Sequence, residues 1–378
     1  MTRRSLCFVM VLGSAVALLL SCGSTNNIDR NIDGGVTLDR NAVFVANRGD
    51  STVSAFQAID PSGAGPVSGS PFLVGGPPTA LVGGDAGEFQ GGLLVLSEPQ
   101  RSVAAYDVDL KTSVLKGPTD AVTTPFTPTA ISGWKSFFYL ANAEGSVSGF
   151  KAGASLAEVP GSPFPAGPGP AAILAHSGFL YVANSQSNDV WGYRIDPTSG
   201  ALTPLAGSPF PSGQNPVSFA WWTPLSSSQQ GASGFVFVAN SGSNNVSVYS
   251  QASDGSLSPV AGSPFAAGDG PSSVAAGGTS SFNFVYVANS KSNSISGYTV
   301  DAKNGSLAPL TSSPVAAGTL PTSMSFSIDR WLYVANLGSN DLSVFQTDWN
   351  TGLLTPIAGS PFAVGKQPSA VLFFQVPQ

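Results

Sequence analysis

Charged residues are scarce in this 378-residue sequence: only 10% are Asp, Glu, Lys or Arg, against about 25% in typical globular domains. The chain has one histidine and two cysteines. A single histidine excludes zinc sites built from several histidines, and any Ser-His-Asp triad would have to use that residue. The 15 basic residues are outnumbered by 21 acidic ones, so no basic surface for nucleic acid is predicted. We expect no nucleic-acid partner, no metal and no cofactor.

Glycine, proline and aromatic residues are plentiful instead. The sequence has 44 Gly, 30 Pro and 23 Phe. So many aromatic side chains exclude a disordered chain, which would be poor in them, and the lack of a Gly-X-Y period excludes collagen. Helical periodicity is absent after the N-terminal apolar segment. The composition therefore favours short strands joined by many turns.

The N-terminus is organised like that of an exported bacterial protein. Arg3 and Arg4 precede an apolar segment from Leu6 to Leu20, which fits a signal peptide and is short of the roughly 20 residues that a membrane span needs. The tetrapeptide LLSC, which ends at Cys22, follows. It resembles a lipobox, in which the cysteine is lipidated and becomes the new N-terminus. Plain secretion with cleavage nearby is the alternative, and a transmembrane anchor is less favoured.

Cleavage before Cys22 would leave a mature chain with one cysteine. We assign residues 1–21 to a lipoprotein signal peptide and the polar residues 22–35 to a flexible tether. With Cys22 as the lipidated residue, the mature chain can form no internal disulfide, although exported proteins often contain them. Gly23 resembles the residue that sorts lipoproteins to the outer membrane. We expect a protein held to the bacterial outer membrane by its lipid alone, on the periplasmic or surface side.

One segment of the sequence recurs seven times. Its clearest copies are FVFVANSGSNNVSVY (235–249), FVYVANSKSNSISGY (284–298) and WLYVANLGSNDLSVF (331–345). The residues aligned with the Asn of the YVAN motif are Asn47, Ser97, Asn142, Asn184, Asn240, Asn289 and Asn336. Successive copies are 42 to 56 residues apart, a spacing that predicts one structural unit used repeatedly.

Each repeat has the pattern of four short strands. A Pro-x-x-apolar segment such as PSSVAAG (271–277) comes first, followed by the YVAN strand and then an alternating VSVY strand. The fourth is an LTPVAGSPF-like strand, whose prolines place it at a sheet edge. Four-stranded units at this period are typical of a β-propeller. We therefore predict an all-β, seven-bladed β-propeller of four-stranded antiparallel blades over residues 36–378.

The order of the strands predicts how the ring closes. The first YVAN strand, from Ala42, has no Pro-x-x-apolar strand before it, and the last such strand, 367–374, has no YVAN strand after it. Pairing this C-terminal strand with the N-terminal blade completes seven equal sets and leaves no open sheet edge. We expect one propeller domain and a monomer.

The YVAN strands and the GSNxVSVY-type segments resemble those of YVTN-repeat propellers and of the seven-bladed lactonase family, which includes 6-phosphogluconolactonases and muconate-lactonising enzymes. The resemblance covers about residues 36–377. It implies His, Arg and acidic side chains around the mouth of the central channel, often with a histidine just before the innermost strand. The corresponding segments GPA (169–171) and NPV (215–217) have none. His176 falls at the other end of such a strand, where we expect a turn-proximal surface residue.

Charged residues interrupt the Asn- and Ser-rich turns of the first three repeats. These turns follow the YVAN strands and are expected at the mouth of the channel. The candidate ligand-binding residues are Arg48, Asp50, Glu98, Arg101 and Glu144. A cluster of arginines and carboxylates could polarise a carbonyl group; alternatively, these charges only keep a charge-poor protein in solution. No individual catalytic residue is assigned.

Two functions stay open. The favoured one is a lipid-anchored, non-catalytic propeller outside the cytoplasm, which binds an envelope protein or a glycan or serves as a scaffold, because catalytic side chains are few and the repeats are nearly uniform. The alternative is a lactonase, a 6-phosphogluconolactonase-like hydrolase whose small lactone would bind at the charged turns. Export would separate such an enzyme from phosphorylated substrates of the cytoplasm.

Overall fold

The computed structural model describes residues 41–57, 65–83, 91–153, 155–224, 234–277, 283–327 and 330–375. The chain divides into two compact units, Met1–Leu38 and Asp39–Gln378, and every described residue belongs to the second. The expected signal peptide, the tether and Cys22 lie outside the described residues. Strands are the regular elements of the described ranges. These ranges include no helix with the length and hydropathy needed to cross a membrane.

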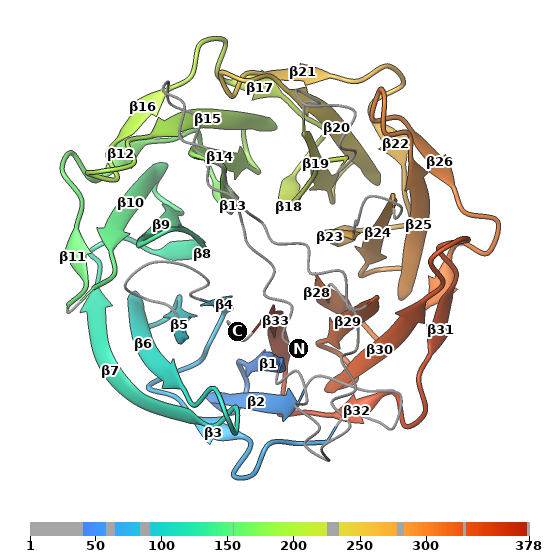
Figure 1. Cartoon of the computed structure of the whole chain (residues 1–378). Helices are drawn as coiled ribbons and strands as arrows, with labels where there is room; N and C mark the ends of the chain where they lie inside the picture. The colour runs from blue at the N-terminus through green and yellow to red at the C-terminus, as the bar shows by residue number, and fades with distance from the viewer. Residues whose placement is uncertain are drawn as a thin grey trace, which may run out of the picture. The chain divides into compact units, whose positions relative to one another are not determined.

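Seven antiparallel sheets are arranged in a ring as the blades of a propeller (Figure 1), as the sequence predicted. We number the blades along the chain and their strands from the ring centre outward. Blade one holds β33 (Pro368–Phe374), β1 (Ala42–Asn47), β2 (Thr52–Gln57) and β3 (Phe72–Leu73). Blade two holds β4 (Ala80–Gly83), β5 (Gly92–Ser97), β6 (Ser102–Val108) and β7 (Leu115–Thr123).

In blades three to seven the outer strand is split into two short segments, which both pair with the third strand. Blade three holds β8 (Pro128–Trp134), β9 (Phe137–Asn142), β10 (Ser146–Lys151), β11 (Ala157–Glu158) and β12 (Phe164–Pro165). Blade four holds β13 (Pro170–His176), β14 (Phe179–Asn184), β15 (Asp189–Ile195), β16 (Leu202–Pro204) and β17 (Phe210–Pro211).

The last three blades repeat this arrangement. Blade five holds β18 (Pro216–Trp222), β19 (Phe235–Asn240), β20 (Asn245–Gln251), β21 (Leu257–Pro259) and β22 (Phe265–Ala266). Blade six holds β23 (Pro271–Gly277), β24 (Phe284–Asn289), β25 (Ser294–Val300), β26 (Leu307–Pro309) and β27 (Val315–Ala316). Blade seven holds β28 (Pro321–Phe326), β29 (Trp331–Asn336), β30 (Asp341–Thr347), β31 (Leu354–Pro356) and β32 (Phe362–Ala363).

Blade one closes the ring in the predicted way. The C-terminal strand β33 pairs antiparallel with β1, with Val371 opposite Val45, and the two lie side by side in Figure 1. The innermost strand of this blade therefore comes from the end of the chain, while its other three strands come from the beginning.

The YVAN strands, which are the second strands of the blades, form the core of the propeller. Every one of their residues is buried. Such continuous apolar strands are expected where both faces of a sheet are covered. Their side chains fill the spaces between blades: Val43 and Val45 of blade one pack in one cluster with Tyr333 and Leu342 of blade seven. Burial of this apolar surface is the main stabilising contribution to the ring.

Tyrosine hydroxyls add polar contacts between neighbouring blades. The hydroxyls of Tyr139, Tyr181 and Tyr286 in the second strands each donate to a glycine carbonyl in the next blade, at 2.7–2.8 Å. The acceptors are Gly200, Gly255 and Gly352, which all have a positive φ. A buried tyrosine needs such a partner for its hydroxyl, so these contacts help to fix how blades three, four and six meet the blades that follow them.

Candidate functional site

Two sets of loops meet at one end of the propeller. The mouth turns join the second and third strands of each blade and comprise residues 48–51, 98–101, 143–145, 185–188, 241–244, 290–293 and 337–340. The entry loops lead into the innermost strands and end at residues 79, 127, 169, 215, 270, 320 and 367. All five predicted ligand-binding residues lie in mouth turns, so the fold brings them to a single end of the ring.

A buried asparagine anchors most mouth turns. Asn289, the last residue of β24, donates from its side-chain amide to the hydroxyls of Ser294 and Ser296, at 3.2 and 3.0 Å. The entry loop packs directly against it, since a Cβ atom added to Gly268 would lie 2.6 Å from the Asn289 side chain. The YVAN asparagine is therefore structural, and it holds the third strand and the entry loop against the turn.

In blades four to seven, a second asparagine joins each mouth turn to the next blade. Its backbone is in the left-handed conformation, which asparagine tolerates better than most residues, and its side-chain oxygen accepts a hydrogen bond from an entry-loop amide. The four donor and acceptor pairs are Asn215 to Asn188, Gly270 to Asn244, Leu320 to Asn293 and Gln367 to Asn340, at 2.7–2.9 Å.

Blades one to three lack this asparagine. Ser51, Arg101 and Gly145 occupy the equivalent left-handed position, with φ values of 56°, 50° and 85°. A left-handed arginine is unfavourable because of its Cβ, and such strain is a reason to look for function nearby. The candidate charged residues therefore occupy the part of the ring where the repeated structural contact is missing. We call Arg48, Asp50, Glu98, Arg101 and Glu144 the charged arc.

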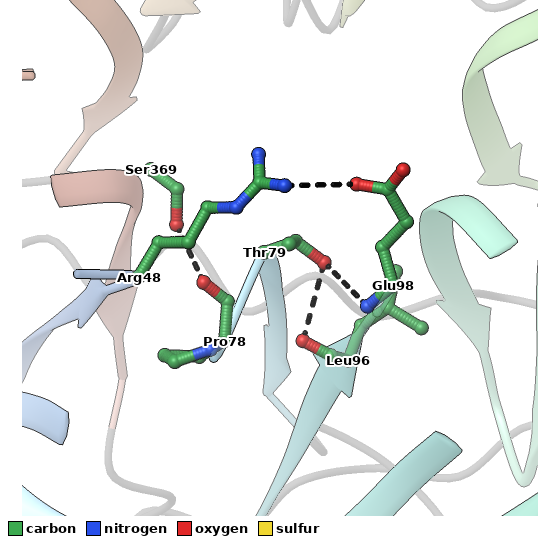
Figure 2. A network of polar contacts seen from close by, with 6 residues as sticks. All are labelled: Arg48, Pro78, Thr79, Leu96, Glu98 and Ser369. Atoms are coloured by element: carbon green, nitrogen blue, oxygen red, sulfur yellow. Dashed lines mark hydrogen bonds and ion pairs between the residues drawn. The ribbon is translucent and has the colours of Figure 1, made fainter. Parts of the chain in front are cut away.

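An ion pair between blades one and two is the central contact of the charged arc (Figure 2). The guanidinium Nη2 of Arg48 lies 3.7 Å from the Glu98 carboxylate, and the two side chains are 46% and 38% exposed. An exposed pair at this distance contributes little to stability. Both groups therefore stay accessible to a ligand.

The other arginine of the arc lies near Glu144. Arg101 donates from Nη1 to the carbonyl of Pro125 at 3.1 Å, and the Glu144 carboxylate accepts the backbone amide of Thr127 at 3.0–3.1 Å. Desolvation acts to raise the pKa of Glu144, but the Thr127 hydrogen bonds and the charge of Arg101 together lower it. Glu144 is thus held ionised, with its carboxylate directed to the backbone.

Asp50 has a local structural role. Its carboxylate accepts the Thr52 hydroxyl at 2.8 Å and the backbone amide of Lys366 at 3.0 Å. Short acidic side chains often bond to nearby backbone in turns. The structure thus brings Arg48 and Glu98 together and places Arg101 beside Glu144, whereas Asp50 fastens its own turn to an entry loop.

His176 lies at the opposite end of β13 from the mouth turns, and it is half-buried rather than a surface residue. Its ring packs on Trp221 with centroids 3.7 Å apart. The Trp221 indole in turn donates to Gln251 Oε1 at 3.2 Å. Burial lowers the pKa of His176 to about 4. The imidazole is therefore neutral at pH 7 and belongs to the packing between blades four and five.

Within the described residues no group of three or more His, Cys, Asp or Glu side chains is arranged to hold a metal ion. The charged arc contains guanidinium and carboxylate groups side by side. Guanidinium groups stabilise negative charge that develops on an oxygen atom, and a carboxylate beside them can take a proton from water. This combination suits the attack of water on an ester carbonyl.

The fold and the mouth turns together define a seven-bladed propeller with a charged site on one rim. The family model described as "Lactonase, 7-bladed beta-propeller" matches residues 136–276 and 258–373. The chain belongs to this lactonase family.

Solved structures share the fold at low identity. A provisionally assigned 6-phosphogluconolactonase of Bacteroides fragilis superposes with a TM-score of 0.74 and 18% identity, over 90% of this chain and 99% of the other. The periplasmic gluconolactonase of Pseudomonas aeruginosa gives a TM-score of 0.71 and 21% identity, over 89% and 99%. A search of curated protein sequences found no match.

Proposed function

We propose that this protein hydrolyses a sugar lactone at the charged arc. Membership of the seven-bladed lactonase family carries the proposal, and the Arg48–Glu98 pair offers the chemistry at the mouth of the ring. We prefer this function to the non-catalytic role that the composition favoured. A low content of charged residues over the whole chain does not argue against an enzyme, because the reaction needs only a few charged groups at one site.

The reaction adds one water molecule across the ester bond of the lactone. Glu98 takes a proton from water, and the resulting hydroxide attacks the carbonyl carbon. Arg48, which faces Glu98, stabilises the negative oxygen of the tetrahedral intermediate. When the intermediate collapses, the bond from the carbonyl carbon to the ring oxygen breaks, and Glu98 returns its proton to that oxygen. The product is the open-chain hydroxy acid.

An uncharged lactone fits the charges of the arc better than a phosphorylated one. The two guanidinium groups are accompanied by three carboxylates, so the arc carries a net negative charge. A phosphate dianion needs an excess of cationic donors at its binding site. We therefore expect kcat/KM for an aldonolactone to exceed that for its 6-phosphorylated counterpart by about tenfold or more, because the carboxylates repel the phosphate.

The test is an acid-release assay with the soluble fragment 23–378 and both lactones, corrected for spontaneous hydrolysis. Turnover of neither lactone would contradict the proposal. It would favour a non-catalytic binding role, for which the specific observation is that no histidine lies in the mouth turns or entry loops. Preference for the phosphorylated lactone would show that the arc binds anions and that the charge argument is wrong.

We also propose that the protein is exported and anchored through a lipid on Cys22, since the LLSC sequence after an apolar segment fits a lipoprotein signal. The Cys22→Ser variant should then appear in the soluble fraction of fractionated cells, whereas the wild-type chain sediments with membranes. Membrane association that survives this change would rule out the lipid anchor. An extracytoplasmic position agrees with an uncharged substrate.

A further inference from the structure

Glu98 is the first residue of the mouth turn in blade two. Its backbone amide has a different hydrogen-bond acceptor from the amide of the first turn residue in the other blades. In the other six blades the first turn residue donates its N–H to the carbonyl of the residue just before the proline that begins the inner strand; in blade two Pro77 holds this place, before Pro78. These pairs are Arg48 to Gln367, Ala143 to Thr127, Ser185 to Gly169, Ser241 to Asn215, Ser290 to Gly270 and Leu337 to Leu320, at 2.7–3.1 Å. The Glu98 amide instead donates to the side-chain hydroxyl of Thr79, at 3.3 Å.

The Thr79 hydroxyl is also used differently from its equivalents. Thr129 and Thr322 follow the first proline of their inner strands as Thr79 follows Pro78. Each of their hydroxyls lies within hydrogen-bond distance of two carbonyl oxygens, one in its own second strand and one in the proline that begins the next inner strand. The carbonyls are those of Ala141 and Pro170 for Thr129, and of Ala335 and Pro368 for Thr322, at 2.7–3.2 Å. The Thr79 hydroxyl keeps the contact with its own second strand, at Leu96, at 3.3 Å. Its second contact is the Glu98 amide (Figure 2).

Thr79 is itself held from the neighbouring blade. The Ser369 hydroxyl of β33 donates to the carbonyl of Pro78, the residue before Thr79, at 2.8 Å. Blade one therefore contacts this part of blade two in two places: Ser369 bonds to Pro78, and the Arg48 guanidinium faces the Glu98 carboxylate (Figure 2). The Thr79 hydroxyl contacts the Glu98 backbone between these two contacts, so it can influence where Glu98 lies relative to Arg48.

We propose that Thr79 is a positioning residue, which sets the Glu98 carboxylate against Arg48 through the Glu98 backbone amide. This inference rests on the proposed function for its catalytic consequence, but the positioning itself does not depend on catalysis. Proton transfer requires the carboxylate to lie within hydrogen-bond reach of the attacking water, and small displacements of a reacting group lower the rate strongly. Thr79 would then affect kcat without touching the lactone.

The test compares Thr79→Val with two matched variants, Thr129→Val and Thr322→Val. Each removes one hydroxyl at an equivalent position, so all three should lower the thermal unfolding midpoint, and the two matched variants should lower it at least as much as Thr79→Val because their hydroxyls also bond to the next blade. Only Thr79→Val should lower kcat, by about tenfold, with KM nearly unchanged. Thr79→Ser, which keeps the hydroxyl, should restore most of kcat. Equal kcat in all three valine variants, or no recovery with serine, would overturn the proposal.

A second measurement needs no activity. Hydrogen–deuterium exchange of peptides that cover residues 97–101 should become several-fold faster in Thr79→Val and stay at the wild-type rate in Thr129→Val, because only the first variant removes the acceptor of the Glu98 amide. Unchanged exchange in Thr79→Val would overturn the proposal whatever the enzyme assay shows. If the wild-type protein does not hydrolyse the lactone but exchange is faster in Thr79→Val, the proposed function is wrong and the positioning role of Thr79 stands.

Discussion

Replacing Glu98 with glutamine is expected to lower kcat/KM for an aldonolactone by about 100-fold or more, the usual contribution of a positioned general base. Glutamine keeps the shape of the side chain and can still contact Arg48, but it cannot accept a proton from water. The loss should fall on kcat, since Glu98 acts in the transition state. Initial rates of acid release over a range of lactone concentrations measure both constants.

A matched variant separates this effect from the loss of any glutamate. Glu158, in β11 of blade three, accepts the Ser162 hydroxyl at 2.9 Å on the exposed outer strand, and Glu158→Gln should leave kcat/KM unchanged. The thermal unfolding midpoint of Glu98→Gln should also stay close to that of the wild type, because the exposed Arg48–Glu98 pair contributes little to folding. Wild-type kinetics in Glu98→Gln would exclude Glu98 as the base.

The strand pattern was predictable because the same order of strand-forming segments occurs in each of the seven repeats. Strands such as Phe235–Asn240 are apolar throughout, and the unpaired strand at each end of the chain fixed the closure through β33. The division of the outer strands was not predicted. It occurs around the Ser-Pro step of the GSPF motif, where the serine hydroxyl accepts a third-strand amide in place of a ladder bond, as Ser263 does from Val248.

The site was predictable only in part. Comparison of the repeats located the charged arc, since its residues interrupt turns that are otherwise rich in Asn and Ser. Sequence could not distinguish Asp50, which bonds to its turn and to Lys366, from Glu98, which faces Arg48. It also missed Thr79, because the residue looks like Thr129 and Thr322. The difference lies in which group its hydroxyl contacts, and that depends on the path of the preceding entry loop.

The partial burial of His176 results from side-chain contacts between adjacent inner strands, at the end of the ring opposite the mouth turns. At two other junctions a large ring faces a glycine: Phe374 faces Gly83, where an added Cβ would lie 2.8 Å from the ring, and Phe326 faces Gly277. At the junction of blades four and five two large rings meet, His176 and Trp221. The tilted contact between the two rings encloses the imidazole, which explains why the expected surface residue is half-buried.

This burial makes folding stability depend on pH. Desolvation lowers the pKa of His176 from 6.5 to about 4 in the folded protein. Between pH 6.5 and pH 4, His176 is therefore protonated in the unfolded chain but not in the folded protein. Its contribution to stability is complete above pH 6.5 and is lost as the pH falls to 4. Allowing for partial exposure, we expect the free energy of unfolding to decrease by roughly 2 kcal/mol between pH 7 and 4.5 on account of this residue.

The His176→Phe variant isolates this contribution, because it keeps an aromatic ring against Trp221 and removes the titrating group. Urea unfolding at pH 7 and 4.5 measures the free energy of unfolding, and its decrease between these pH values should be smaller in the variant than in the wild type by that amount. Carboxylates such as Asp196 and Asp348 affect both proteins alike. The single histidine also gives one imidazole Cε1–H signal in NMR spectra, whose titration reports its pKa directly. A midpoint above 6 would mean that the ring is solvated and that the packing between blades four and five is looser than described.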